Sequence, residues 1–267
     1  MKASTEEFLY ILLWTADSVL RPTWRNLDES FESWAYRNGL GRRLEALERQ
    51  KLVERQQVPD MSRVYRLTAE GRRAALGGCD PTERWARPWD GRWRLVLFDL
   101  PFNASRLRAK MRRHLLRHRF GYLQQSVWVT PDSLQEVHRQ LRGKSVDVES
   151  LILFEGEPCG GESDGAIVRG AWNFAAINAL YAGHEAILSE CPEAPSSHVP
   201  PSSRFWIWAR REREAWKAAL CRDPLLPQVL LPAEYRGRRS WEARKELLGW
   251  LHRGFRIQAL MRSSVQG

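Results

Sequence analysis

The strongest constraint on the fold of this chain is a succession of short strands and helices in its middle third. The run RWRLVLFDLP is apolar enough to predict a buried strand, and Ser105 stands where it can cap the helix that follows. The predicted strands are 92–101, 125–131 and one within 145–156, and the predicted helices are 105–118 and 133–141. Strands that alternate with helices over such short lengths predict a small α/β sandwich of the ferredoxin-like kind.

Residues 1–76 show a different pattern: helix, helix, helix, strand, turn, strand, helix, which is the layout of a winged helix-turn-helix. Leu40, Leu44 and Leu47 recur at the spacing of one buried helix face, and Thr68 is placed to cap the last helix. In such a module the helix before the hairpin enters the major groove of DNA. The candidate DNA-binding side chains on or just before that helix are Arg37, Asn38, Arg42, Arg43 and Arg49, and those on the hairpin are Arg55 and Arg63.

Positive charge is concentrated in the middle of the chain. The net charge is +10, and residues 90–145 hold 12 Lys/Arg against 4 Asp/Glu, whereas 1–76 hold 13 against 11 and 146–267 hold 15 against 15. The main source is one amphipathic helix, whose apolar face can dock on a sheet. Its basic residues are Arg106, Arg108, Lys110, Arg112, Arg113, Arg117 and Arg119. The sequence leaves open whether this face binds phosphate, an acidic partner or only solvent.

The expected organisation is an α+β chain of three domains. Gly and Pro residues in 77–89 predict a linker between the DNA-binding domain of residues 1–76 and the central domain of residues 90–160. Residues 161–267 are expected to form a mainly helical effector or dimerisation domain, with helices near 170–189, 204–221 and 240–261.

Several classes of protein are disfavoured by what the sequence lacks. The four cysteines are far apart with no C-x-x-C pair, which argues against a disulfide framework or a zinc site. The sequence has no run of 18 apolar residues and no secretory layout at its start, so we expect a cytoplasmic protein without a membrane span. It has no G-x-S-x-G, phosphate-loop or H-E-x-x-H motif, and we expect no metal and no cofactor.

Two alternatives remain from the residues alone. Asp99, at the end of the first central strand, is the residue type that holds a divalent ion in a nuclease, with Asp132 and Asp147 as companions. One carboxylate without a second motif makes a poor metal site, so structural capping is the favoured role of Asp99. The other alternative is a passive nucleic-acid-binding module that has no effector.

Four segments together resemble the PaaX-type family of regulators. They are GRWRLVLFDLP at 91–101, HRFGYLQQSVWVTPDSL at 118–134, AWNFAAINALYAGH at 171–184 and RDPLLPQVLLPAEYRG at 222–237, and the end of the hairpin at 65–76 is similar as well. In this family an arginine-rich helix, a Gly-Tyr/Phe-x-Leu turn and a Val-Trp-Val-x-Pro strand follow the first central strand. The resemblance also extends to the small ferredoxin-like subunit of CRISPR spacer adaptation, with Asp99 and 125–128 at the matching places.

The resemblance implies a transcriptional repressor rather than an enzyme. It implies a homodimer on a pseudo-palindromic operator, and release from double-stranded DNA by a coenzyme A thioester, phenylacetyl-CoA in the type case. The stretch that corresponds to the family's recognition helix reads GLGRRLEALERQ and departs from the family pattern, which implies a different operator. No effector-contact residue can be assigned from the motifs.

Overall fold

The computed structural model describes residues 41–58, 61–75, 80–98, 105–124, 126–141, 151–192 and 203–264. The helices predicted before residue 37 lie outside the described residues, and with them the first half of the predicted winged helix-turn-helix. The chain divides into two compact units. One comprises the described residues of Met1–Asp80, Tyr181–Ala218 and Arg236–Gly267, and the other comprises Pro81–Leu180 and Ala219–Tyr235.

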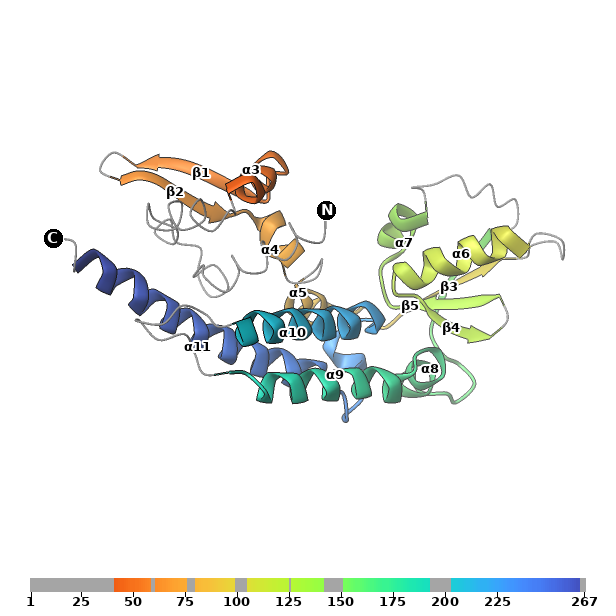
Figure 1. Cartoon of the computed structure of the whole chain (residues 1–267). Helices are drawn as coiled ribbons and strands as arrows, with labels where there is room; N and C mark the ends of the chain where they lie inside the picture. Colours follow the sequence, from red (N-terminus) through yellow and green to blue (C-terminus); the bar gives the residue numbers. More distant parts are fainter. Residues whose placement is uncertain are drawn as a thin grey trace. The chain divides into compact units, whose positions relative to one another are not determined.

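The described N-terminal residues form a helix, a hairpin and a second helix (Figure 1). These are α3 (Gly41–Arg49), β1 (Val53–Val58), β2 (Met61–Leu67) and α4 (Ala69–Ala75). The two strands pair antiparallel with Val53 opposite Leu67. Leu44 and Leu47, on the predicted apolar face of α3, are both buried. Beyond α3, the predicted strand–turn–strand–helix order is therefore confirmed.

The turns around this hairpin are fixed by three residues. The amide of Lys51 donates to the carbonyl of Glu48 at 2.9 Å, and that of Leu52 to Leu47 at 3.0 Å, so α3 ends in a Schellman motif with Lys51 left-handed at φ 56°. Thr68 caps α4, because its Oγ1 accepts from the amide of Gly71 at 2.9 Å. Gly71 has no room for a side chain: a Cβ there would lie 1.9 Å from the carbonyl oxygen of Leu52.

The central residues fold into a four-stranded antiparallel sheet with two helices in the order βαββαβ (Figure 1). The elements are β3 (Trp93–Phe98), α6 (Ser105–Arg117), β4 (Gly121–Gln124), β5 (Val127–Thr130), α7 (Leu134–Leu141) and β6 (Leu151–Gly156). The strand order is β4-β5-β3-β6, so the first and third strands are central, as in the ferredoxin-like topology expected. The alternation of strands and helices is thus confirmed.

One strand of this sheet was not predicted. Residues 121–124 match the family's turn motif, yet they form edge strand β4, paired with β5 through Tyr122 and Trp128. A four-residue strand that begins with glycine gives little periodic signal. The glycine is required by packing, because a Cβ on Gly121 would lie 2.6 Å from both the Trp172 ring and Ala171 Cβ.

The core of this domain lies between the sheet and its helices. Val96 and Trp128 from the sheet pack with Met111, Leu115 and Val137 from α6 and α7, and all five are buried. On the other face, Trp93 contacts Trp172 and donates from its indole N–H to Asp164 at 2.8 Å. This second contact docks α8 (Asp164–Ala171) against the sheet, and α8 also packs on β4.

The segment expected to be a linker contains a short helix, α5 (Pro81–Ala86). Its Trp85 is buried and makes an edge contact with Tyr235, at 6.0 Å between ring centroids. The glycine and proline residues in 77–89 favour an irregular linker. Even so, burial of the single large Trp85 side chain supplies enough apolar area to stabilise a short helix in this segment.

The C-terminal third is helical, as predicted: α9 (Phe174–Ser189), α10 (Ser203–Arg222), the 3-10 turn η2 (Gln228–Leu230) and α11 (Gly237–Ser264). None of the helices among the described residues is long and apolar enough to cross a lipid bilayer.

A buried polar network joins α9, α10 and α11. Glu212 Oε1 accepts from His184 Nε2 at 2.9 Å and from Arg244 Nε at 2.6 Å, while His184 Nδ1 lies 2.7 Å from Ser240 Oγ. All four side chains have no exposed surface. Burial, with Arg244 close by, lowers the pKa of His184 to about 3, so the ring is neutral at neutral pH. Burial raises the pKa of Glu212, and the Arg244 guanidinium opposes that rise.

Candidate nucleic-acid interface

The first candidate surface is on α3. Arg42 and Arg49 are exposed there, and Arg42 has no ion-pair partner among the described residues. Arg55, on β1, lies 3.4 Å from Glu48 of α3, so the hairpin and the helix share an ion pair. Arg37 and Asn38 lie outside the described residues, as do the side chains of Arg43 and Arg63.

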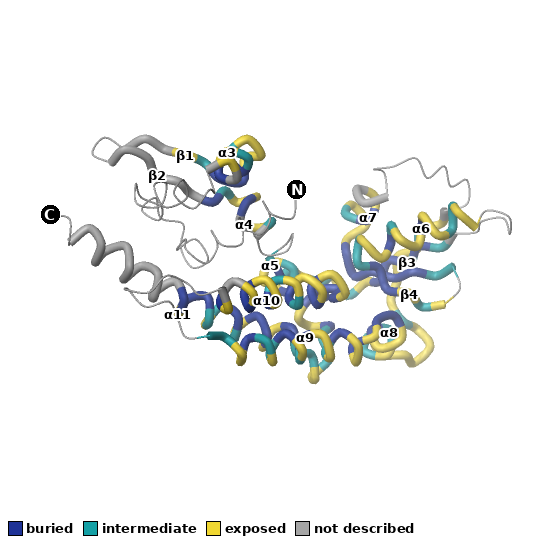
Figure 2. The backbone as a smooth tube through the Cα atoms, viewed as in Figure 1, coloured by how far each residue is buried: buried dark blue, intermediate teal, exposed yellow. Residues whose placement is uncertain are grey.

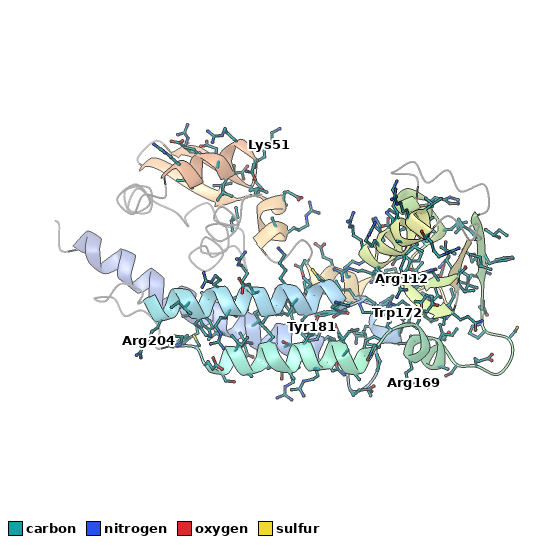
Figure 3. The ribbon with its side chains drawn as sticks, turned by 45° about the vertical axis from the view of Figure 1, so that its right-hand side comes forward. Lys51, Arg112, Arg169, Trp172, Tyr181 and Arg204 are labelled. Atoms are coloured by element: carbon teal, nitrogen blue, oxygen red, sulfur yellow. The ribbon has the colours of Figure 1, made fainter. Side chains whose placement is uncertain are left out.

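The second candidate surface is on α6. This helix buries Met111 and Leu115 against the sheet and turns basic side chains to solvent, and its outer face is exposed in Figure 2. Four exposed cations, Arg106, Lys110, Arg113 and Arg117, fall at the spacing i, i+4, i+7, i+11 and form what we call the α6 stripe. Figure 3 shows side-chain nitrogen atoms gathered around this helix near Arg112.

Among the described residues, the α6 stripe has no compensating negative charge. Ser105–Arg117 contains no carboxylate, and within the described part of the chain no acidic side chain pairs with a member of the stripe. Arg94, on β3 of the same domain, differs from the stripe because it has carboxylate partners. Its guanidinium donates to Asp90 at 2.8 Å and to Glu155 at 2.9 Å. The bonds from Arg94 lower the pKa of Asp90 to about 2. Charge on β3 is therefore neutralised internally, whereas no described carboxylate neutralises the charge on the stripe.

The structure separates three predicted basic residues from the stripe. Arg108 is half-buried and already has an interaction partner. The Arg112 guanidinium lies over the Tyr122 ring, 5.6 Å from its centroid, where it gains a cation–π contact. Arg119 is the third, and its environment is the most specific.

Arg119 lies in the turn just after α6, and its side chain bonds to the C-terminal end of α10. The amide of Arg119 donates to Leu116 and that of Phe120 to Leu115, both at 3.0 Å, with Arg119 left-handed at φ 67°. Its guanidinium then donates to the carbonyl of Leu220 at 2.8 Å and to that of Asp223. A cation at a helix C-terminus satisfies carbonyls that the helix leaves without partners. Arg119 therefore has a structural role, and we leave it out of the stripe.

The nuclease alternative is weakened at Asp132. This side chain is 4% exposed and pairs with Arg84 at 3.1 Å and Arg87 at 2.9 Å. A carboxylate held by two guanidinium groups is not disposed to bind a cation. Asp99 and Asp147 lie outside the described residues.

The fold and surfaces define a class of protein: an α+β chain that combines a helix–hairpin–helix segment, a ferredoxin-like domain with a basic helix, and a helical C-terminal part.

Residues 86–168 match the family model described as the PaaX protein central Cas2-like domain. Among curated proteins, the chain is 28% identical over 193 residues to the transcriptional repressor PaaX of Escherichia coli (strain K12). That match covers 67% of this chain and 59% of the relative, so it spans less than two thirds of the relative's length. The two matches confirm the resemblance to PaaX-type regulators.

One solved structure has a similar fold. The uncharacterized protein Rv0674 from Mycobacterium tuberculosis superposes with a TM-score of 0.56, covering 93% of this chain and 97% of that one. The two sequences are 17% identical, so this likeness concerns the fold alone.

Proposed function

We propose that this protein is a DNA-binding transcription regulator, a repressor that acts in the cytoplasm through a winged helix-turn-helix within residues 1–76. The observation that supports this most is the similarity to the PaaX repressor over 193 residues, together with a hairpin that follows a helix with exposed arginines. In this proposal α3 enters the major groove, where Arg42 and Arg49 reach guanine edges or phosphates.

Alanine at Arg42 or Arg49 is expected to weaken operator binding about 10- to 100-fold, the equivalent of about 1–3 kcal/mol for a specific arginine contact. The measurement is fluorescence anisotropy with a duplex from the protein's own upstream region. Arg73→Ala is the matched control: Arg73 is an exposed arginine on α4 that pairs with Glu70 at 2.8 Å. If all three variants lose affinity equally, only net charge matters and α3 is not the reading helix.

We further propose that the protein binds as a homodimer and that a small effector, such as an aryl- or acyl-CoA thioester, releases it. Two half-sites about one helical turn apart fit a two-fold symmetric dimer. An effector that binds more tightly to a geometry with the wrong half-site spacing lowers operator affinity by shifting the population.

A panel of coenzyme A thioesters titrated onto the preformed complex tests the effector. At least one is expected to lower operator affinity about tenfold or more, as a coupling of 1–3 kcal/mol implies, while free coenzyme A has little effect. A complex that no thioester changes, but that still binds one sequence selectively, would retain the regulator and remove this class of effector.

A further inference from the structure

We propose that the α6 stripe binds the phosphate backbone of duplex DNA as a contact distinct from that of α3. This inference rests on the proposed function only in taking duplex DNA as the partner. The sites differ in kind: α3 is assigned to reading sequence, whereas the stripe provides charge without base specificity.

The geometry of the stripe is that of a straight row. At 3.6 residues per turn, positions 106, 110, 113 and 117 fall within an arc of about 60° of the helix surface. At 1.5 Å per residue, the row is about 16 Å long. All four side chains are exposed, and the buried Met111 and Leu115 fix the helix so that this row faces solvent.

The electrostatic energy of this row of cations is unfavourable when the protein is not bound to a partner. Like charges at i, i+3 and i, i+4 repel, and a cation in the first turn, such as Arg106, opposes the helix dipole. Two exposed arginines elsewhere in the chain have carboxylate partners: Arg211 pairs with Glu190 at 2.8 Å and Arg73 with Glu70 at 2.8 Å. A helix that carries a line of exposed cations, none of them paired with a described carboxylate, is suited to a partner that supplies a line of negative charge.

Duplex DNA fits this description better than a compact anion. It presents one negative charge per roughly 1.7 Å of its axis, so a row about 16 Å long can engage several phosphates at once. A coenzyme or free phosphate would engage one or two cations and leave the others uncompensated. Guanidinium groups, three of the four here, form paired bonds with phosphate oxygens.

The test is the salt dependence of binding by the full-length protein to a mixed-sequence 40-base-pair duplex, between about 50 and 200 mM salt. Each phosphate contact contributes about 0.9 to the slope of log K against log salt. The variant with glutamine at all four stripe positions is therefore expected to have a slope smaller in magnitude by about 3–4. Arg113→Gln alone should reduce it by about 0.9.

The matched control removes four exposed arginines elsewhere: Arg204, Arg210, Arg238 and Arg239, each to glutamine. The inference holds if the control variant retains the wild-type slope while the stripe variant has a reduced slope. The stripe variant must also melt at or above the wild-type melting temperature, which shows that it is folded. An unchanged slope in the stripe variant overturns it, as does an equal loss in the control. If the wild-type protein binds its operator selectively but the stripe substitutions leave the slope unchanged, this inference alone is rejected. If the stripe substitutions reduce the slope but the wild-type protein shows no sequence selectivity, the proposed function alone is rejected.

Discussion

Glu212→Gln is expected to lower the free energy of unfolding by about 3–5 kcal/mol, the cost of breaking a buried ion pair. Glutamine has nearly the same shape, so packing is preserved and the effect is electrostatic. The change leaves the guanidinium of Arg244 buried beside the stacked Trp216 and Trp241 rings without its carboxylate. Arginine cannot lose its proton to escape this cost. The bond from His184 to Oε1 survives in the variant, which isolates the loss to the charge.

Chemical denaturation monitored by tryptophan fluorescence measures this effect. Two variants serve as controls. Glu214→Gln, two residues further along α10 and exposed, is expected to change stability by less than about 0.5 kcal/mol. The double variant Glu212→Gln/Arg244→Met is expected to recover much of the loss, because it removes the unpaired charge and places a thioether against the two indole rings. If the double variant is less stable than Glu212→Gln, the charge imbalance is not the cause.

Asp132→Asn is the second large expected effect, a loss of about 3 kcal/mol. Asp132 accepts from Arg84 and Arg87, and Arg87 also donates to the carbonyls of Arg84 and Leu225. Burial lowers the pKa of Arg87 to about 10, with Asp132 acting against that change. An amide at position 132 removes the negative charge that stabilises the Arg87 cation. It also turns an N–H group toward an arginine. The connection of α5 to the end of β5 should therefore weaken.

The same denaturation assay measures this loss, with Glu83→Gln on α5 as an exposed control. The substitution also separates the regulator from the nuclease alternative. An Asp132→Asn protein of wild-type stability that had lost a Mg²⁺-dependent cleavage activity would support the nuclease and contradict the ion-pair role assigned here.

Sequence patterns predict this fold where a periodic signal exists. The apolar runs at β3 and β5 and the amphipathic face of α6 are local signals, and the ferredoxin-like order follows from their alternation. The strand β4 has four residues and starts with a glycine, so it gives no such signal. The helix α5 depends on contacts between Trp85 and Tyr235, which are far apart in the sequence.

For the candidate sites too, the sequence predicts local features but not contacts between residues far apart in the chain. Composition identifies α6 as basic, but only the fold separates the exposed stripe from Arg119, whose partners lie about a hundred residues later. The network of Glu212, His184 and Arg244 gave no signal in the sequence, because charged residues that alternate along a helix usually indicate a solvated face. Burial of these groups depends on how α9, α10 and α11 pack.

The most direct test of the central claim is a footprint of the purified protein on its own upstream DNA at about 150 mM salt, near physiological screening. A regulator predicts one protected, pseudo-palindromic site that Arg42→Ala weakens and Arg73→Ala does not. Uniform weak protection that fades as salt increases would contradict a sequence-specific regulator and favour a passive nucleic-acid-binding protein.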